Sequence, residues 1–386
     1  FLRTLDKGLK RIDAIMAAQK NSIISGGDAF ELLDTFGFPI DLTRLIAAEN
    51  NLSVDETGFE VEMQKQKERS RAATALDTGD WQNLDESISQ GFAGYDSLET
   101  KTKVLRYRKV KGKGKELYQI VLEQTAFFAE SGGQGGDTGK NIFSEAEIEI
   151  IEKKKENDLI IHFAEEIPAN LNGAVQAIVN ASNRKAITVH HSATHLMHAA
   201  LRKILGTHVA QKGSLVNKEH LRFDFSHFAK MTDEEIANVE KLVNEKIREN
   251  IPVVIKSMPK DDALALGAMA LFGEKYGDVV RVVIIDPSYS IELCGGCHVG
   301  STGQIGLFKI KSESAIAAGV RRIEAVCGHA AENFIRLAFE ENKHINALLK
   351  NPKDVPKAVE LLQTENVELK KRIESIEARQ LVAIRN

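Results

Sequence analysis

The sequence predicts an α+β protein of several domains, because its hydrophobic pattern changes along the 386 residues. Helical spacing dominates residues 1–84, where we expect a helical region, and short alternating runs over 85–172 predict a small antiparallel β-barrel. Helical and strand patterns mix over 173–330, as in an α+β domain. A heptad-like repeat within 331–386 predicts a coiled-coil-like C-terminal helix.

The composition is that of a globular protein in a reducing compartment. Hydrophobic residues make up 43% and charged residues 27%. Three cysteines are too few for a disulfide framework in this length, so we expect a cytoplasmic location. No stretch approaches the ~20 apolar residues of a membrane span, so we expect no membrane partner. The net charge of −4 argues against a generically basic nucleic-acid coat, although basic residues gathered on one face could still bind RNA.

The N-terminal region combines helical spacing with a break near Pro39. Five apolar residues recur three or four apart: Leu2, Leu5, Leu9, Ile12 and Met16. Pro39 interrupts the pattern, and Asp41 is placed to cap the following helix. The chain starts at Phe1, inside this pattern and without methionine, so we expect a piece of a longer protein.

A glycine-rich loop, Glu130–Gly139, lies in the middle of the predicted barrel. Its spacing misses the phosphate-binding P-loop, because Gln134 stands where the first glycine belongs. It also misses the dinucleotide-binding pattern, because Thr138 stands where the last glycine belongs. We therefore interpret the loop as a barrel turn whose backbone can approach a partner backbone closely.

His191 and His195 form the first half of a candidate metal site. They lie in a helical pattern that ends at Gly206, a residue that takes the left-handed conformation of a helix C-terminus without steric cost. Residues four apart share one helix face, within about 6 Å of each other. An apolar stripe occupies nearly the opposite face, so we expect the two histidines to face a cleft.

Cys294 and His298 form the second half. The β-branched run at 279–286 predicts a buried strand, and two glycines after Cys294 let the next loop turn tightly enough for the thiol and the imidazole to converge. Two histidines on a helix, with one cysteine and one histidine from a loop, suit Zn²⁺ in tetrahedral geometry.

Several other interpretations of these residues stay open or fail. His198 lies on the same helical face and Cys297 offers a second thiol, so the ligand set has competitors. A histidine pair alone is more simply a solvated helix face. The Cys294-x-x-Cys297-His298 pattern also matches c-type haem attachment, but no export signal accompanies it. The zinc-protease motif fails, because Ser192 stands where the general-base glutamate is required.

The C-terminal segment has coiled-coil spacing. Its apolar residues alternate four and three apart, with Asn366 at an a-type position: Val359, Leu362, Leu369, Ile373 and Ile376. A coiled coil, which would make a homodimer possible, and a single helix packed back on the body fit the pattern equally well.

Motifs along the whole chain resemble those of alanyl-tRNA synthetases. The editing domain of that family is similar to the segments His191-Ser-Ala-Thr-His, His208-Val-Ala-Gln-Lys-Gly, Cys294-Gly-Gly-Cys-His and Ala318-Gly-Val-Arg-Arg. Other regions of the same family are similar to the segments Phe128-Ala-Glu-Ser-Gly-Gly-Gln and Leu33-Asp-Thr-Phe-Gly-Phe-Pro. The helical N-terminal part and the tail favour the synthetase over the shorter free-standing editing proteins.

The resemblance implies a bacterial-type synthetase fragment without the N-terminal adenylating domain and the extreme C-terminal domain. The full-length family joins alanine to tRNA(Ala) with ATP and Mg²⁺, but its class II aminoacylation motifs are not in this stretch, so we expect no alanine activation by this chain. Residues 1–84 would belong to the tRNA-recognition region. Asp34 is the first candidate for a contact to the acceptor stem, and Asp41 is the second.

For residues 173–330 the resemblance implies an editing domain that hydrolyses mischarged Ser-tRNA(Ala) and Gly-tRNA(Ala). It implies four Zn²⁺ ligands, which are His191, His195, Cys294 and His298. Gln211 matches the family's editing glutamine, a catalytic residue that orients substrate or water. Cys297 departs from the family, which has threonine at that position, and adds a competing thiol.

Two other classes of function stay open beside this one. The chain could be an RNA-binding and dimer-forming module in which zinc is purely structural. It could also be a generic zinc hydrolase that acts on small esters without any tRNA.

Overall fold

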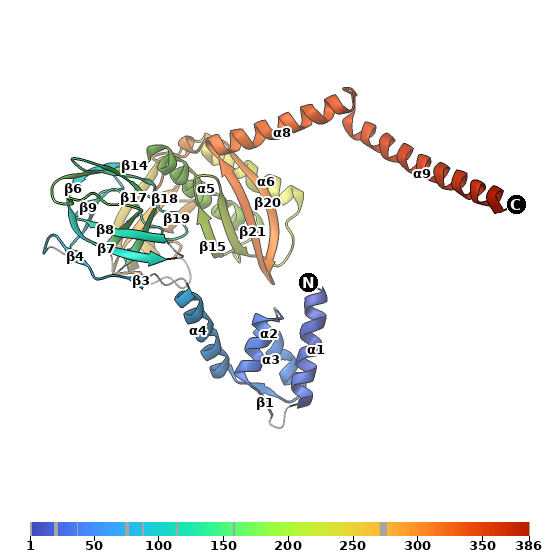
Figure 1. Ribbon diagram of the computed structural model, residues 1–386, viewed down its shortest axis with the longest axis horizontal. Helices are drawn as coiled ribbons and strands as arrows, with labels where there is room; N and C mark the ends of the chain where they lie inside the picture. The colour runs from blue at the N-terminus through green and yellow to red at the C-terminus, as the bar shows by residue number, and fades with distance from the viewer. Residues whose placement is uncertain are drawn as a thin grey trace. The chain divides into compact units, whose positions relative to one another are not determined.

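The computed structural model of the chain describes residues 2–18, 22–36, 38–73, 77–86, 89–112, 115–156, 159–270 and 276–385. The chain divides into two compact units. One contains Phe1–Trp81 with Arg108–Leu117, and the other contains Gln82–Tyr107 with Tyr118–Asn386. The elements are labelled in Figure 1.

Helices dominate the first unit, as the apolar spacing predicts. They are α1 (Leu2–Ala18), α2 (Gly26–Asp34), α3 (Ile40–Glu49) and α4 (Glu56–Ala73), with a short parallel pair formed by β1 (Ile23–Ile24) and β2 (Ser53–Val54). Ile12, Leu32 and Phe38 are buried in the core of this unit. The capping prediction for Asp41 is wrong, because Pro39 occupies the N-cap position of α3 and Asp41 lies inside the first helical turn.

The antiparallel strands predicted for residues 85–172 are present, but within the described residues their ladders do not close into the predicted barrel. One sheet has the order β11–β10–β14–β6, with strands Glu147–Ile150, Gly139–Ile142, Val175–Val179 and Glu99–Thr102. The other runs β12–β13–β8–β7, with strands Glu152–Glu156, Leu159–Ala164, Lys115–Leu122 and Val104–Gly112.

The reason lies at Ile151, where the chain leaves one sheet and enters the other. Strands β11 and β12 are consecutive but hydrogen-bond to different neighbours, and Ile151 N donates to Phe163 O (3.0 Å) of β13. Side chains from both sheets, among them Ile148 and Leu122, still enclose one buried core around Phe127. Small pairs flank these sheets: β3 (Asp77–Thr78) and β4 (Gln82–Asn83) pair with β7, and β5 (Gly91–Phe92) is parallel to β9 (Gln124–Thr125).

After β14, the described residues of 181–327 form two antiparallel sheets beside the long helix α5 (Ala181–Leu205). The first sheet has the order β15–β16–β21–β20, with strands Gln211–Val216, Leu221–Ser226, Val320–Cys327 and Phe308–Ala317. The second has the order β17–β18–β19, with strands Val253–Pro259, Val279–Ile285 and Ser290–Leu293. Helices α6 (Asp233–Arg248) and α7 (Lys260–Ala265) and the 3₁₀ turn η1 (Thr302–Ile305) complete the region. One apolar core joins α5, α6 and both sheets.

Local signals in the sequence explain where several of these elements begin and end. The Thr232 hydroxyl accepts a hydrogen bond from Glu235 N (3.1 Å), and the Glu235 carboxylate accepts one from Thr232 N (2.8 Å), so a capping box starts α6. Gly319, with a φ of +69°, forms the tight turn between β20 and β21.

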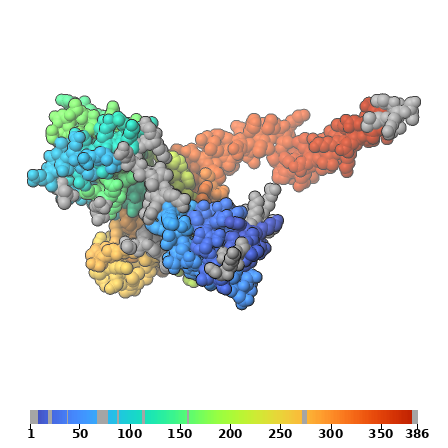
Figure 2. All heavy atoms as spheres, turned by 60° about the horizontal axis from the view of Figure 1, so that its bottom comes forward, coloured from blue at the N-terminus to red at the C-terminus, as the bar shows by residue number. Residues whose placement is uncertain are grey.

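Two helices make up the C-terminal segment, α8 (Gly328–Leu348) and α9 (Val355–Arg385). Lys350 and Asn351 have positive φ values of 64° and 53° and separate them. Residues 359–380 of α9 are exposed along their length, as the red end of the space-filling view shows (Figure 2). The predicted helix is therefore present, and the homodimer stays a prediction.

Among the described helices, none combines the length and the apolar character needed to cross a bilayer.

Candidate metal centre and pocket

Helix α5 carries two of the candidate metal ligands. The Asn180 side chain accepts a hydrogen bond from Asn183 N (3.0 Å) at its start, and Gly206, with a φ of +116°, follows its last residue. The apolar stripe packs into the core, as predicted. The opposite face, with His191 and His195, is buried as well, because the loop after β19 and the glycine-rich loop both contact it.

The loop after β19 carries the other two candidate ligands, and Arg281 of β18 holds it in place. Its Nη1 donates to the carbonyl oxygens of Cys294 (2.9 Å) and Gly296 (2.7 Å). The guanidinium lies 4.2 Å from the ring centre of Tyr95, whose hydroxyl donates to Gly295 O (2.6 Å). The loop backbone is therefore fixed from two sides.

Four possible ligand atoms converge between α5 and this loop. They come from His191, His195, Cys294 and His298, and all lie within 4.8 Å of one another. Cys294 Sγ lies 3.4 Å from His191 Nε2 and 3.3 Å from His298 Nε2. A tetrahedral zinc ion bonded at about 2.0–2.1 Å to nitrogen and about 2.3 Å to sulfur separates its ligand atoms by roughly 3.3–3.6 Å. These four residues therefore fit a zinc ion.

Each of the three histidines turns Nδ1 away from this centre, toward a different polar group. Nδ1 of His191 bonds Gln134 Oε1 (2.7 Å) and Nδ1 of His298 bonds Ser192 Oγ (3.1 Å), whereas Nδ1 of His195 lies 3.5 Å from Glu292 Oε2 without a hydrogen bond. Outer partners of this kind fix the tautomer and orient the ligating nitrogen. Nε2 is then the atom that each ring offers to a metal.

Gln134 brings the glycine-rich loop to the metal centre. Its Oε1 also accepts a hydrogen bond from Cys297 N (2.8 Å). Because an amide oxygen only accepts, Nδ1 of His191 carries the proton. The loop pairs with β15 through Gly133 O and Gly135 N, which bond the backbone of Val216 at 2.7 and 2.8 Å. The predicted close approach to a partner backbone is thus confirmed, and the partner is a strand of the same chain.

Arg184 of α5 ties the same loop to the helix from its other end. Its Nε donates to Asp137 Oδ1 (2.8 Å), and its Nη2 pairs with the second carboxylate oxygen. Arg184 also donates to the carbonyl oxygens of Gly94 (2.5 Å) and Ala126 (2.9 Å). Since all of these groups are buried, the loop that carries Gln134 is held rigidly against α5.

Gln134 and Glu292 were missed by the sequence analysis. Gln134 is the polar residue inside a run of glycines and is completely buried. Glu292 shares a face of β19 with Ser290, and both are buried in spite of their polarity. The available signal was a polar residue, Glu292, on a strand that ends next to the candidate ligand Cys294. Its partners, His195 and His198, lie far away in the sequence.

Burial sets the protonation of the candidate ligands. It lowers the pKa of His191 to about 3, with a further contribution from His195, and it also lowers the pKa of His195. Burial raises the pKa of the Cys294 thiol to about 12. Near neutral pH the imidazoles are therefore uncharged and ready to ligate, whereas the thiol must lose a proton first.

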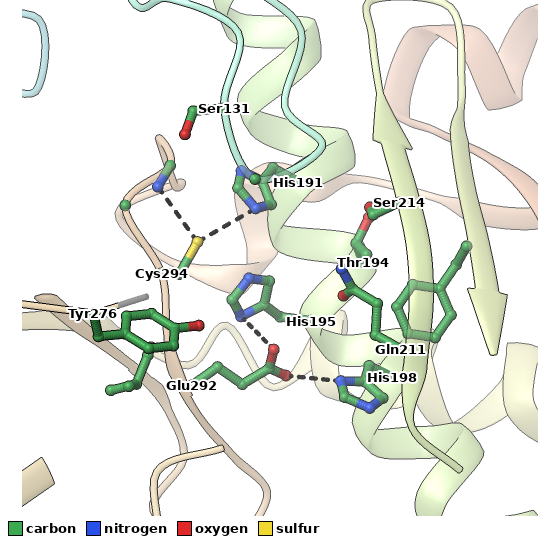
Figure 3. A pocket seen from close by; sticks show the side chains of 15 residues that line it. Ser131, His191, Thr194, His195, His198, Gln211, Ser214, Tyr276, Glu292 and Cys294 are labelled. Carbon is green, nitrogen blue, oxygen red and sulfur yellow. Dashed lines mark hydrogen bonds and ion pairs between the residues drawn. The ribbon is translucent and has the colours of Figure 1, made fainter. Parts of the chain in front are cut away.

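A small pocket of about 80 Å³ opens beside this centre, and its side chains are drawn in Figure 3. Gln211, the first residue of β15, lies in its wall together with His191, His195 and Cys294. Polar groups from Thr194 and Ser214 line it as well. The fold thus brings the candidate catalytic glutamine to the same pocket as three of the candidate ligands, His191, His195 and Cys294.

The two competitors for the ligand set lie outside it. The group of four within the described residues contains neither Cys297 nor His198. Cys297 instead offers its backbone N–H to Gln134, and His198 lines the pocket one helical turn beyond His195.

The two candidate tRNA contacts belong to the other compact unit. Asp34 ends α2, is exposed, and accepts a hydrogen bond from Gln66 Nε2. Asp41 is exposed and pairs with Arg44 (3.1 Å).

Comparisons with protein families identify the class. Residues 1–184 match the family model of class II (A) tRNA synthetases. Residues 280–324, which include Cys294 and His298, match the second additional domain of threonyl and alanyl tRNA synthetases.

Individual relatives narrow the class to one family. The chain is 52% identical to an alanine–tRNA ligase of Cytophaga hutchinsonii, with 100% of the chain and 44% of the relative aligned. It is 50% identical to those of Christiangramia forsetii and Bacteroides fragilis, with 97% of the chain and 43% of each relative aligned. The chain belongs to the alanyl-tRNA synthetase family and spans less than half the length of these relatives.

Proposed function

We propose that this chain hydrolyses Ser-tRNA(Ala) and Gly-tRNA(Ala) at the pocket beside the four candidate metal ligands. The observation that carries the proposal is that Gln211 lines the same small pocket as His191, His195 and Cys294. The second additional domain, matched at residues 280–324, supplies the Cys294 loop of that pocket.

Such hydrolysis is needed because binding alone cannot separate alanine from serine and glycine accurately enough. One hydroxyl or one methyl group changes binding by only about 1–3 kcal/mol, so a site built for alanine also accepts serine and glycine. A second site that removes the wrong ester restores accuracy. For the whole protein we propose the joining of alanine to tRNA(Ala) with ATP and Mg²⁺, and we do not assign that step to residues 1–386. A cytoplasmic location stays a prediction.

The residues of the pocket have separate roles in the proposed hydrolysis. Bound to all four ligands, zinc would have no open position, so it supplies a fixed positive charge that helps to position substrate and water. The Gln211 amide can donate to the ester carbonyl or accept from the attacking water. The loop that carries Cys294 and the glycine-rich loop both line the pocket and reduce its contact with bulk water, which strengthens these interactions.

The test is hydrolysis of Ser-tRNA(Ala), Gly-tRNA(Ala) and Ala-tRNA(Ala), with zinc quantified on the same sample. We expect Gln211→Ala to lower hydrolysis of the two mischarged esters about 100-fold, as for the loss of one positioned polar group, while zinc and tRNA affinity are retained. Gln363→Ala, on the exposed helix α9, is the control and should match the parent chain.

Other outcomes of this experiment would contradict the proposal or favour one of the two other classes of function. Unchanged hydrolysis in Gln211→Ala would remove Gln211 from the chemistry. Bound zinc and tRNA without any hydrolysis would favour a binding module with structural zinc, and turnover of small esters without tRNA would favour a generic hydrolase.

We further propose Asp34, and after it Asp41, as contacts to the tRNA acceptor stem. Both carboxylates are exposed and can accept hydrogen bonds from a base edge. We expect Asp34→Asn to weaken tRNA(Ala) binding several-fold, measured by filter binding at fixed salt, because an amide presents one acceptor in place of two. Equal affinity of the variant and the parent chain would reject Asp34.

A further inference from the structure

His198 is a polar side chain in the pocket with no role in the candidate metal centre. It lies on α5 three residues after His195, or about 4.5 Å further along the helix axis. The residue is 5% exposed and lines the pocket. Neither Nδ1 nor Nε2 has a hydrogen-bond partner among the described residues, although a buried polar atom normally has one. An atom of this kind, placed in a pocket wall, indicates a missing ligand group.

Glu292 determines what His198 can offer. Its carboxylate lies between two histidines, with Oε2 3.5 Å from His195 Nδ1 and Oε1 3.4 Å from His198 Nδ1, as Figure 3 shows. The Ser290 hydroxyl also donates to Oε1 (3.3 Å). Because a carboxylate attracts a proton on the nearby Nδ1, Nε2 is the ring nitrogen placed to accept a hydrogen bond.

The ring of His198 is held from a second side as well. Its centre lies 5.1 Å from that of Phe223, a buried residue of β16 that also lines the pocket. Glu292 and Phe223 together fix where the Nε2 lone pair lies.

We propose that His198 is a specificity-determining residue that accepts a hydrogen bond from the side-chain hydroxyl of a seryl ester, with Glu292 as its positioning residue. This inference rests on the proposed hydrolysis and deepens it by naming the group that recognises serine. Alanine has a methyl group in place of that hydroxyl and leaves Nε2 desolvated and unpaired, which opposes binding of the correctly charged tRNA. Glycine has no side chain and allows a water molecule to remain on Nε2.

The position of His198 fits this role. His198 lines the same pocket as His191 and His195, about one helical turn further along α5, so an ester near the metal-ligand end has His198 beside it. Gln211 lies in the same wall and acts on both esters, whereas His198 contacts only a substrate that carries a hydroxyl. Substitution of Gln211 is therefore expected to slow hydrolysis of both esters, whereas substitution of His198 is expected to slow hydrolysis of the seryl ester alone.

The experiment compares His198→Leu and His198→Gln with the parent chain on Ser-tRNA(Ala) and Gly-tRNA(Ala). We expect His198→Leu to lower kcat/KM for the seryl ester about 10- to 100-fold and that for the glycyl ester less than about threefold, with zinc retained. His198→Gln keeps an acceptor near the position of Nε2, so it should recover most of the seryl activity.

A second measurement uses non-hydrolysable adenosines that carry a 3′-seryl or 3′-glycyl amide. Calorimetry should show that His198→Leu loses the preference for the seryl analogue, whether or not the parent chain turns over tRNA. Equal losses on the two substrates, loss of zinc, or an unchanged ratio of the two affinities would each overturn the role of His198. Absence of hydrolysis in the parent chain, together with a seryl preference that depends on His198, would instead refute only the proposed hydrolysis.

Discussion

Cys294→Ser is expected to lower the zinc affinity of this chain at least 100-fold. Four ligands share a binding free energy of about 10–16 kcal/mol in structural sites, so the loss of the only sulfur removes several kcal/mol. The serine hydroxyl is shorter in reach and does not ionise near neutral pH. Competition with a chromophoric chelator measures the affinity. Cys297→Ser is the matched control, because Cys297 lies outside the group of four and should keep full zinc binding.

The role of Cys294 as a ligand has a second, independent test, which is the number of protons that the parent chain releases when it binds zinc. Burial raises the pKa of Cys294 to about 12 and lowers that of His191 to about 3 in the metal-free chain. Between pH 7 and 8 the thiol is therefore protonated and the imidazoles are neutral, so zinc binding releases one proton and its affinity rises about tenfold per pH unit. Calorimetry in two buffers of different ionisation enthalpy counts that proton.

Three results would contradict this assignment. Full zinc binding by Cys294→Ser would show that the thiol is not a ligand. Loss in Cys297→Ser alone would make Cys297 the sulfur ligand. Affinity that does not change with pH would show that no thiol ionises on binding.

The sequence predicted the group of four candidate ligands because the geometry of each half is local. His191 and His195 share a helix face by their spacing alone, and Cys294 and His298 converge within one short glycine turn. The capping box at Thr232 and the turn at Gly319, both seen in the structure, also depend only on residues that are close together in the sequence. Local patterns alone do not show that the two histidines of the helix meet the loop of Cys294 and His298. That step was suggested by the ligand preference of zinc.

Features that depend on distant segments were missed or wrong. Gln134 reaches His191 across 57 residues, and nothing near either of them indicates the contact. The barrel prediction failed on closure for the same reason. Alternation of apolar residues identifies strands, but the switch of sheets at Ile151 depends on which distant strand each edge meets.

Gly296→Ala is expected to damage the metal centre although position 296 holds no ligand. A Cβ there would overlap the His191 imidazole and lie 2.7 Å from Gln134 Oε1. The atoms in its way are buried and fixed by hydrogen bonds, so the ring, the glutamine or the whole loop must move. Displacement of an outer partner of a ligand costs about 10- to 100-fold in metal affinity, and overpacking costs about 1–3 kcal/mol of stability.

Gly295→Ala provides the matched comparison, one residue away in the same loop. A Cβ at position 295 has no heavy atom within 4 Å beyond its chain neighbours, so it enters open space. We expect this variant to keep the zinc affinity and the urea-unfolding midpoint of the parent chain, whereas Gly296→Ala lowers both. The readouts are metal affinity and unfolding because Gly295 and Gly296 both line the pocket and could affect hydrolysis directly. If the two variants behave alike, the close packing of His191, Gln134 and the Cys294 loop does not govern metal binding. If only Gly296→Ala fails, metal binding depends on the close packing of the Cys294 loop against His191 and Gln134.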